Sequence, residues 1–205
     1  MGAVATLLLA IFAAAAAPKR PNMPVGWTWP PSASMRAAGS ECLARLDEAG
    51  VVYGPGPATK KIATPVVLPA LTVGELGLTP LRGKGSYPMD CQLAAAIAEV
   101  APELGALGVR ALRFRTLHEY RTVRKRGRDT KILSRHALGL AIDVFGVELE
   151  DGRVLAVESD WATQPKLAEI VAVFASSPRF RTPLTPANDP GDHGDHVHLE
   201  AHMRL

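Results

Sequence analysis

The chain has 205 residues, of which 47% are hydrophobic, and a formal net charge of +3. This length and composition fit one globular domain with tails, large enough to bury a core. The small positive charge suits an anionic cell envelope but does not identify a partner. Only 5% of the residues are aromatic and the sequence shows no nucleic-acid-binding motif, so we do not expect it to bind nucleic acid.

Residues 1–17 have the character of a secretory signal peptide. Ala3–Ala17 is a mostly apolar run that ends in small residues and is too short to span a bilayer comfortably as a mature helix. No Lys or Arg precedes it, and Pro18 disfavours cleavage directly after Ala17, so we expect a cut slightly earlier. The alternative is an uncleaved N-terminal anchor. We predict an exported protein of the periplasm or cell envelope, with no membrane span in its mature form.

Residues 18–40 are rich in Pro, Ser and Ala, which predicts an extended linker. Ser40 is then expected to cap a short helix over Glu41–Ala49. Val51–Tyr53 is a short strand candidate. Pro65–Leu71 is apolar but interrupted by two prolines, which favours an edge strand.

The middle of the chain contains a predicted helix and a predicted strand. Thr72–Tyr87 has no clear hydrophobic period and is expected to be loop. Pro88 opens a helix at the favoured first-turn position, and this helix runs through Met89–Val100 until Pro102 ends or kinks it. Val109–Thr116 alternates imperfectly between apolar residues and arginines, which predicts a strand with one solvent-exposed face.

The last part of the chain is expected to alternate between sheet, helix and loop. Glu119–Lys131 contains six basic residues and is predicted to be a solvated loop. A core strand, a hairpin with an Asp-Gly turn, a helix and a proline-punctuated loop follow at Ile142–Val147, Glu148–Val157, Thr163–Ser176 and Pro178–Pro190. Val197–Met203 alternates cleanly and is the last predicted strand, with His198 and Glu200 on its solvent-exposed face.

Cys42 and Cys91 are the two cysteines of the chain. Neither has a second cysteine or a histidine at the spacing of a metal ligand, so we do not place them at a metal. Export permits disulfides, and we favour a Cys42–Cys91 bridge. Two buried free thiols are the alternative.

Four of the six histidines occur in two short segments, Ser134–Val144 and His193–Glu200. In the second segment His196 and His198 are two residues apart, so on a strand both rings face the same side. Their backbones are then about 6.5–7 Å apart. This spacing is compatible with one ring on a metal and the other above the metal's water ligand.

The first segment supplies one imidazole and one carboxylate. His136 and Asp143 lie seven residues apart, and a turn at Gly139 lets both side chains reach one point. Together with His198 they provide the donor set of an open catalytic zinc site, whose remaining position holds water. The same donors occur in non-haem iron enzymes, but the histidine and carboxylate are then usually closer in sequence. We therefore predict zinc.

These residues carry a resemblance. The pattern Ser134-x-His136-x-x-Gly139-x-Ala141-x-Asp143 with a downstream His196-x-His198 resembles the zinc peptidase superfamily of lysostaphin-type endopeptidases, D-Ala-D-Ala metallopeptidases and the hedgehog signalling domain. More closely, Cys42–Leu205 resembles the bacterial extensin-like protein C-terminal domain family. The matching pieces are Cys42-Leu43-Ala44-x-Leu46, Pro65-Val66, the helix opening around Cys91, Leu133-Ser134-x-His136-Ala137-x-Gly139-x-Ala141-Ile142-Asp143, and His193-x-Asp195-His196-x-His198.

The resemblance implies a zinc metallopeptidase of endopeptidase or carboxypeptidase type, with the two histidines and the aspartate named above as its ligands. His196 falls where related D-Ala-D-Ala carboxypeptidases keep a catalytic histidine, and Asp195 is the second candidate for the base. His193 also matches a histidine of those enzymes. Ser134 and Glu200 are expected to hold the ligand rings in place rather than to bind the metal.

The chain departs from the family pattern in two places. The family usually shows Ser-Tyr-x-Cys-Arg after its central strand, and here Thr122 and Val123 occupy the cysteine and arginine positions. Arg121 or Arg124 is then the candidate for the cation that stabilises the tetrahedral oxyanion. A family cysteine near Lys60–Ile62 is also missing, which leaves Cys42 and Cys91 as the remaining pair.

We therefore predict an α+β domain over residues 41–205, in which a small antiparallel sheet carries the zinc site and helices pack on its other face. The expected function is that of a monomeric, secreted peptidase that hydrolyses peptide bonds of peptidoglycan stem peptides or cross-links. The alternative is a binding module for cell wall or protein that keeps the zinc but does not hydrolyse. The missing family arginine favours this module, whereas the presence of His196 and Asp195 opposes it.

Overall fold

The computed structural model describes residues 22–58, 61–83, 85–125 and 127–204. The predicted signal peptide, residues 1–17, lies outside these ranges. Within them, no helix is both long enough and apolar enough to cross a membrane.

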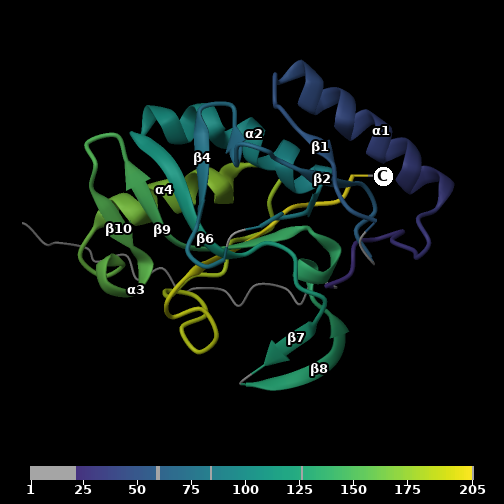
Figure 1. Ribbon diagram of the computed structural model, residues 1–205. Helices are drawn as coiled ribbons and strands as arrows, with labels where there is room; N and C mark the ends of the chain where they lie inside the picture. Colours follow the sequence, from purple (N-terminus) through teal and green to yellow (C-terminus); the bar gives the residue numbers. More distant parts are fainter. Residues whose placement is uncertain (1–21, 59–60, 84, 126, 205) are drawn as a thin grey trace, which may run out of the picture.

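A six-stranded sheet lies at the centre of the fold, in the order β10-β9-β6-β4-β3, with β11 also paired to β9 (Figure 1). Its strands are β3 (Thr72–Val73), β4 (Leu76–Pro80), β6 (Val109–Thr116), β9 (Ala141–Leu149), β10 (Val154–Ala156) and β11 (Val197–Glu200). The pairs are antiparallel except β4 with β6, which is parallel. The prediction of an antiparallel sheet therefore holds for all of its pairs but one.

Helices cover one face of this sheet. They are α2 (Cys91–Ala106) and α4 (Pro165–Ser176), whereas α1 (Ala33–Glu48) packs on α2 and the single-turn α3 (Val157–Asp160) contacts β9 and β10. Phe174 of α4 lines one small internal cavity with Leu112, Val144 and Leu199 of the sheet, and α2 contacts β6 and α4. Neighbouring residues on a strand face opposite sides. Residues that alternate with this apolar set, such as Asp143, therefore lie on the face away from α4.

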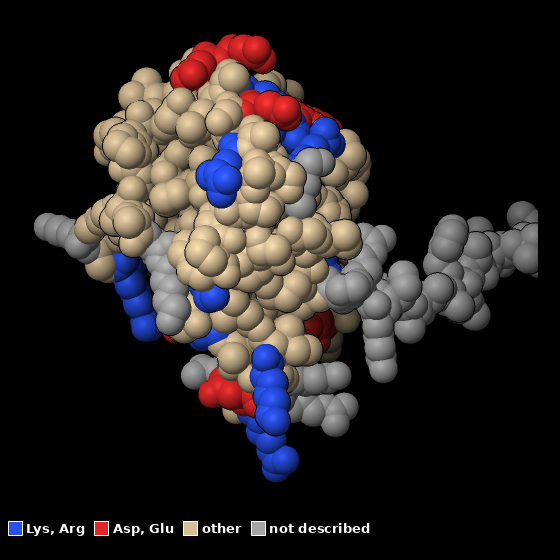
Figure 2. Space-filling model, turned by 90° about the vertical axis from the view of Figure 1, so that its right-hand side faces the viewer, with Lys and Arg blue, Asp and Glu red and all other residues tan. Residues whose placement is uncertain are grey.

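Two smaller sheets complete the fold. One joins β1 (Gly54–Pro55), β2 (Pro65–Val67) and β5 (Met89–Asp90), and the other is the hairpin of β7 (Thr122–Lys125) and β8 (Arg128–Leu133), which projects from the body (Figure 1). Figure 2 shows that Lys and Arg side chains on the face drawn are separated by uncharged residues and do not merge into one basic patch.

The first helix begins earlier than predicted. It starts at Ala33 rather than Glu41, because Ser32 caps it by accepting the N–H of Met35 at 3.2 Å. The last residues of the predicted linker, 18–40, are therefore helical. Small residues dominate this first part of the helix, so it lacks the apolar period that would have revealed it.

The second helix also differs from its prediction. Asp90, not Pro88, precedes α2 and caps it by accepting the N–H of Gln92 at 3.0 Å. Pro102 lies inside the helix, which continues to Ala106. The other Asp90 oxygen accepts the N–H of Thr64, so this carboxylate also connects the helix to the neighbouring segment. Burial raises the pKa of Asp90 to about 6, although its backbone hydrogen bonds act in the opposite direction.

Two predicted loops contain strands. Residues 72–87 hold β3 and β4, and residues 119–131 hold most of the β7–β8 hairpin. A hairpin that pairs with itself in solvent can carry charges on both faces, so its sequence shows no apolar alternation. Conversely, Val51–Tyr53 is not a strand, and the N–H of Val51 instead bonds to Leu46 at the end of α1. Strand β6 has the bounds that the sequence predicts.

Cys42 of α1 and Cys91 of α2 form the predicted disulfide, with their Cα atoms 6.1 Å apart. Both residues are fully buried. The bridge closes a loop with a sequence separation of 49, for which the chain-entropy model gives a stabilisation of roughly 4 kcal/mol.

Replacing both cysteines by alanine should therefore lower the free energy of unfolding by about 4 kcal/mol. Denaturant titration of the double variant and of the parent protein, each with and without reductant, measures this loss. Reductant should destabilise only the parent. Equal stability of the two proteins without reductant would contradict the prediction.

Candidate metal centre

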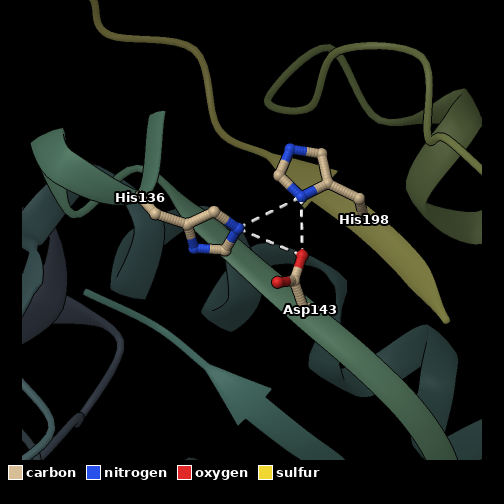
Figure 3. Close-up of side chains that lie close together, drawn as sticks. All are labelled: His136, Asp143 and His198. Atoms are coloured by element: carbon tan, nitrogen blue, oxygen red, sulfur yellow. Dashed lines mark hydrogen bonds and ion pairs between the residues drawn. The ribbon is translucent and has the colours of Figure 1, made fainter. Parts of the chain in front are cut away.

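Three buried side chains from separate parts of the chain converge on one point, as Figure 3 shows. They are His136, Asp143 and His198, and their candidate ligand atoms all lie within 4.8 Å of one another. Asp143 Oδ1 lies 3.1 Å from His136 Nε2 and 2.7 Å from His198 Nδ1. The two ring nitrogens are 3.3 Å apart.

Strand pairing brings two of these residues together. Asp143 on β9 lies directly opposite His198 on β11. Directly opposed residues on an antiparallel pair share a face, with their Cβ atoms about 4.5–5.5 Å apart. The register therefore holds the carboxylate and the imidazole side by side on the face away from α4.

A tight turn brings the third residue. His136 lies in the 3₁₀ helix η1 (Arg135–Leu138), where the Ser134 hydroxyl accepts the N–H of His136 at 3.3 Å. Gly139 ends the turn with φ +67°, and a Cβ there would lie 2.6 Å from the backbone nitrogen of Asp90. Only glycine satisfies both the left-handed conformation and this close approach. The predicted turn at Gly139 is thus confirmed.

The hydrogen-bond partners of the two rings fix which nitrogen carries a proton. His136 Nδ1 lies 3.0 Å from the carbonyl oxygen of Leu117, which can only accept, so Nε2 keeps a lone pair. His198 Nε2 lies 3.2 Å from the carboxylate of Glu200, so in the neutral ring that donates to Glu200 its Nδ1 keeps a lone pair, whereas in the protonated ring Nδ1 donates to Asp143. Both lone pairs point at Asp143 Oδ1, itself an acceptor. With both rings neutral, three acceptors meet with no hydrogen between them, so the cluster needs either a proton on His198 or a metal cation.

The donor set fits zinc. Two imidazoles and one carboxylate are the ligands of known catalytic zinc sites, with metal–ligand bonds of about 2.0–2.2 Å. Tetrahedral bonds of that length place ligand atoms roughly 3.3 Å apart. The three separations of 2.7–3.3 Å are close to this value, so small side-chain movements would suffice to accept the ion.

The shifted pKa values of Asp143 and His198 also indicate that positive charge stabilises the cluster. Burial acts to raise the pKa of Asp143, but His136 and His198 outweigh it and hold this pKa well below its ordinary value. Burial acts to lower the pKa of His198, yet its hydrogen bonds to Asp143 and Glu200 raise it to about 9. A proton on His198 therefore serves as the cation of the metal-free site, and metal binding must release it.

Glu200 Oε1 contacts His198 Nε2, and the second carboxylate oxygen of Glu200 forms an ion pair with Arg181. Burial acts to raise the pKa of Glu200, but His198 and Arg181 lower it to about 2. The prediction that this face of β11 is exposed to solvent is wrong, since the side chain of Glu200 is only 14% exposed. Backbone bridges from Phe180 to Ala201 and from Leu184 to His198 place the preceding loop alongside the strand, and Arg181 of this loop pairs with Glu200.

Replacing Glu200 by glutamine should weaken the acid sensitivity of the metal-free protein. A carboxylate with a depressed pKa contributes stability that is fully present above its unfolded value near 4.5 and is lost as the pH falls toward 2. The shift corresponds to about 3 kcal/mol. Unfolding free energies measured against pH in a chelator should show a lower plateau and a shallower acid slope for the variant. Identical slopes would contradict this role.

A second group of polar residues lies beside the three candidate ligands. His196 Nδ1 donates to Asp195 at 2.7 Å, which leaves its Nε2 with a lone pair 3.6 Å from Asp143 Oδ1. The His196 ring stacks on Phe145, with centroids 4.9 Å apart, and the side chain is 14% exposed. His196 is therefore held in one orientation at the edge of the cluster.

His193 adds a third imidazole to this edge. Its ring lies 4.9 Å from that of His196 and 5.3 Å from that of His198, and its Nδ1 contacts Asp189 at 2.9 Å. Burial lowers the pKa of His193, and the two neighbouring rings add to this effect. In a neutral His193 that donates from Nδ1 to Asp189, Nε2 can accept a hydrogen bond from a bound ligand.

Arg121, one of the two residues predicted to stabilise an oxyanion, is paired with a residue outside the cluster. Arg121 Nε forms an ion pair with Glu119 at 2.9 Å, and none of its contacts among the described residues is to the three candidate ligands. The side chain of Arg124, the other candidate, lies outside the described part of the chain. The sequence also missed Leu117, Phe145 and Arg181, because each acts through a tertiary contact that no local motif encodes.

Comparison with known protein families identifies a match over most of the chain. Residues 40–205 match the family model described as the extensin-like protein C-terminus. This range includes both cysteines and both histidine segments. No curated protein and no solved structure matches the chain.

Proposed function

The chain belongs to the extensin-like protein C-terminal family, and on this premise we propose that it is a secreted, zinc-dependent peptidase of the bacterial cell wall. Its substrates would be peptide bonds of peptidoglycan stem peptides or cross-links. The observation that carries the proposal is the convergence of three lone pairs beside an independent histidine–aspartate pair. A place within the superfamily of D-Ala-D-Ala metallopeptidases, lysostaphin-type endopeptidases and hedgehog domains is part of the same proposal.

His136, Asp143 and His198 would hold the zinc ion. When bound, zinc supplies a Lewis acid that polarises the scissile carbonyl and lowers the pKa of water to about 7. The Leu117 carbonyl and the Glu200 carboxylate keep the two ligand rings in the required orientation.

His196 acts as the general base in this proposal. Its Nε2 accepts a proton from water, while Asp195 accepts the hydrogen bond from Nδ1 and stabilises the resulting imidazolium. The imidazolium then gives this proton to the leaving amine. His193 lies close enough to hydrogen-bond the substrate beside His196.

Export is also part of the proposal. The predicted signal peptide supports it, and so does the Cys42–Cys91 disulfide, since such bonds persist in oxidising compartments such as the periplasm.

A zinc-keeping binding module is the second candidate. The pairing of Arg121 with Glu119 favours it, because an oxyanion then lacks the cation expected from the sequence.

Muropeptide analysis of purified sacculi tests the two candidates. The mature chain is loaded with zinc, stripped with a chelator, or stripped and reloaded, and then incubated with sacculi. We expect new peptide fragments with the loaded and reloaded protein only. The masses of these fragments would identify the peptide bond that is cleaved. Protein that retains zinc but releases no fragments would reject the peptidase and favour the binding module.

A further inference from the structure

Arg115 presents a guanidinium group that is separated from the proposed base by one aromatic ring. It lies on β6, and its Cζ is 3.8 Å from the centre of the Phe145 ring. The other neighbour of Phe145 in this stack is His196, whose ring is 4.9 Å away with an interplanar angle of 18°. A guanidinium, a phenyl ring and an imidazole therefore follow one another, and the imidazole lies against the metal cluster.

The other arginines of this strand are paired with a carboxylate, whereas among the described residues Arg115 is not. Arg110 and Arg113 both contact Glu148, at 3.2 and 3.7 Å. Among the described residues no carboxylate pairs with Arg115. An uncompensated cation in this position is not needed for the fold, because a solvated arginine gains little from one aromatic contact.

The stack leaves the hydrogen-bonding edge of Arg115 available. A guanidinium on an aromatic face keeps its N–H donors in its own plane, where they match the two oxygens of a carboxylate. Contact with Phe145 also limits the positions of the side chain, so less conformational freedom is lost on binding.

There is space for a ligand at this place. Arg115 lines a pocket of about 360 Å³ with residues 86–88 and 116–119. The same segment contributes the Leu117 carbonyl that orients His136, so the pocket adjoins the backbone that supports the cluster.

We propose that Arg115 binds a carboxylate of the peptide substrate and thereby selects peptides that carry one close to the scissile bond. This inference rests on the proposed function. The distances of 3.8 and 4.9 Å place the guanidinium carbon at most about 9 Å from the His196 ring. An extended peptide advances roughly 3.5 Å per residue, so the carboxylate lies one or two residues from that bond. Its source is either the C-terminus or an acidic side chain.

Binding of short peptides to the zinc-loaded protein tests whether Arg115 binds a substrate carboxylate. The probes are acetyl-D-Ala-D-Ala, with a terminal carboxylate only, acetyl-D-Glu-D-Ala amide, with a side-chain carboxylate only, and acetyl-D-Ala-D-Ala amide, with neither. Affinities come from NMR titration at a temperature and time at which no probe is consumed. The variants are Arg115→Gln and the matched control Arg110→Gln, from the same strand.

We expect the parent and Arg110→Gln to bind one carboxylate probe on the order of tenfold more tightly than the neutral amide. The preferred probe names the source of the carboxylate. Arg115→Gln should lose this preference while its zinc content and its affinity for the neutral probe stay unchanged. Failure of the parent to digest sacculi would reject the peptidase, yet this preference would still stand.

Three results would overturn the inference. They are the absence of any preference in the parent, an undiminished preference in Arg115→Gln, and an equal loss of affinity for charged and neutral probes. The last result would mean that Arg115 only supports the Phe145 and His196 rings.

Discussion

Asp143→Asn is expected to remove tight zinc binding while leaving the fold intact. The substitution replaces the one anionic donor of the cluster by a neutral amide of the same size. Structural zinc sites bind with roughly 10–16 kcal/mol, so one of about four ligands contributes some 3–4 kcal/mol, or a few hundredfold to a thousandfold in affinity. Competition with a chromophoric chelator measures this change.

The fold should survive because the introduced amide can donate where the carboxylate could not. His136 Nε2 and His198 Nδ1 both present lone pairs to this position, and an amide N–H can satisfy one of them without a metal. The metal-free variant should therefore stay folded, with a thermal midpoint below that of the metal-free parent because it loses the pairing of Asp143 with protonated His198. The parent alone should gain stability when zinc is added.

Asp151→Asn is the matched control, since Asp151 is an exposed aspartate in the turn between β9 and β10. It should bind zinc as the parent does. Unchanged zinc affinity in Asp143→Asn would show that the metal, if bound, is held elsewhere. Loss of folding in that variant, seen in its circular dichroism, would instead reveal a structural role for the carboxylate.

The sequence predicts those parts of the cluster that depend on local geometry. The turn at Gly139 needs only the conformational freedom of glycine and the cap from Ser134, and both are encoded within a few residues. That His198 and Asp143 lie near each other follows from pairing two strands that each carry a strong apolar pattern.

The contacts that orient the cluster could not be predicted in this way. Leu117 acts through its backbone carbonyl, so its side chain carries no signal. Arg181 reaches Glu200 from a loop rich in proline, and Arg115 is distinguished from other arginines only by its position over Phe145. Burial of β11 has the same origin, because its alternating pattern does not reveal which segment pairs alongside it.

The start of α1 could not be predicted for a different reason. Its first turns contain Ala, Ser and Gly residues, which can face solvent or another segment equally well. Gly39 is buried, and a Cβ there would meet the Thr64 hydroxyl at 2.2 Å. The small residues that let α1 approach its neighbour closely are the same residues that made the sequence look like a linker.

His196→Ala is expected to reduce peptide hydrolysis by roughly 10²–10⁴-fold, the usual contribution of a general base. Zinc should be retained, because the ligand atoms belong to other residues. Release of fragments from sacculi by the zinc-loaded variant measures the rate, and zinc content measured on the same sample excludes loss of the metal. His202→Ala, a histidine outside the cluster, is the control.

The role of His196 also predicts a difference between two substitutions. Asp195→Asn keeps a hydrogen-bond acceptor near His196 Nδ1 but removes the charge that stabilises its protonated form. The rate should then fall less than in His196→Ala, and its acid limb should move to lower pH, since the imidazole protonates less readily. In His196→Ala this limb should disappear. If both variants keep the parent's pH profile, His196 is not the base, and a role in binding the substrate would remain for the ring that stacks on Phe145.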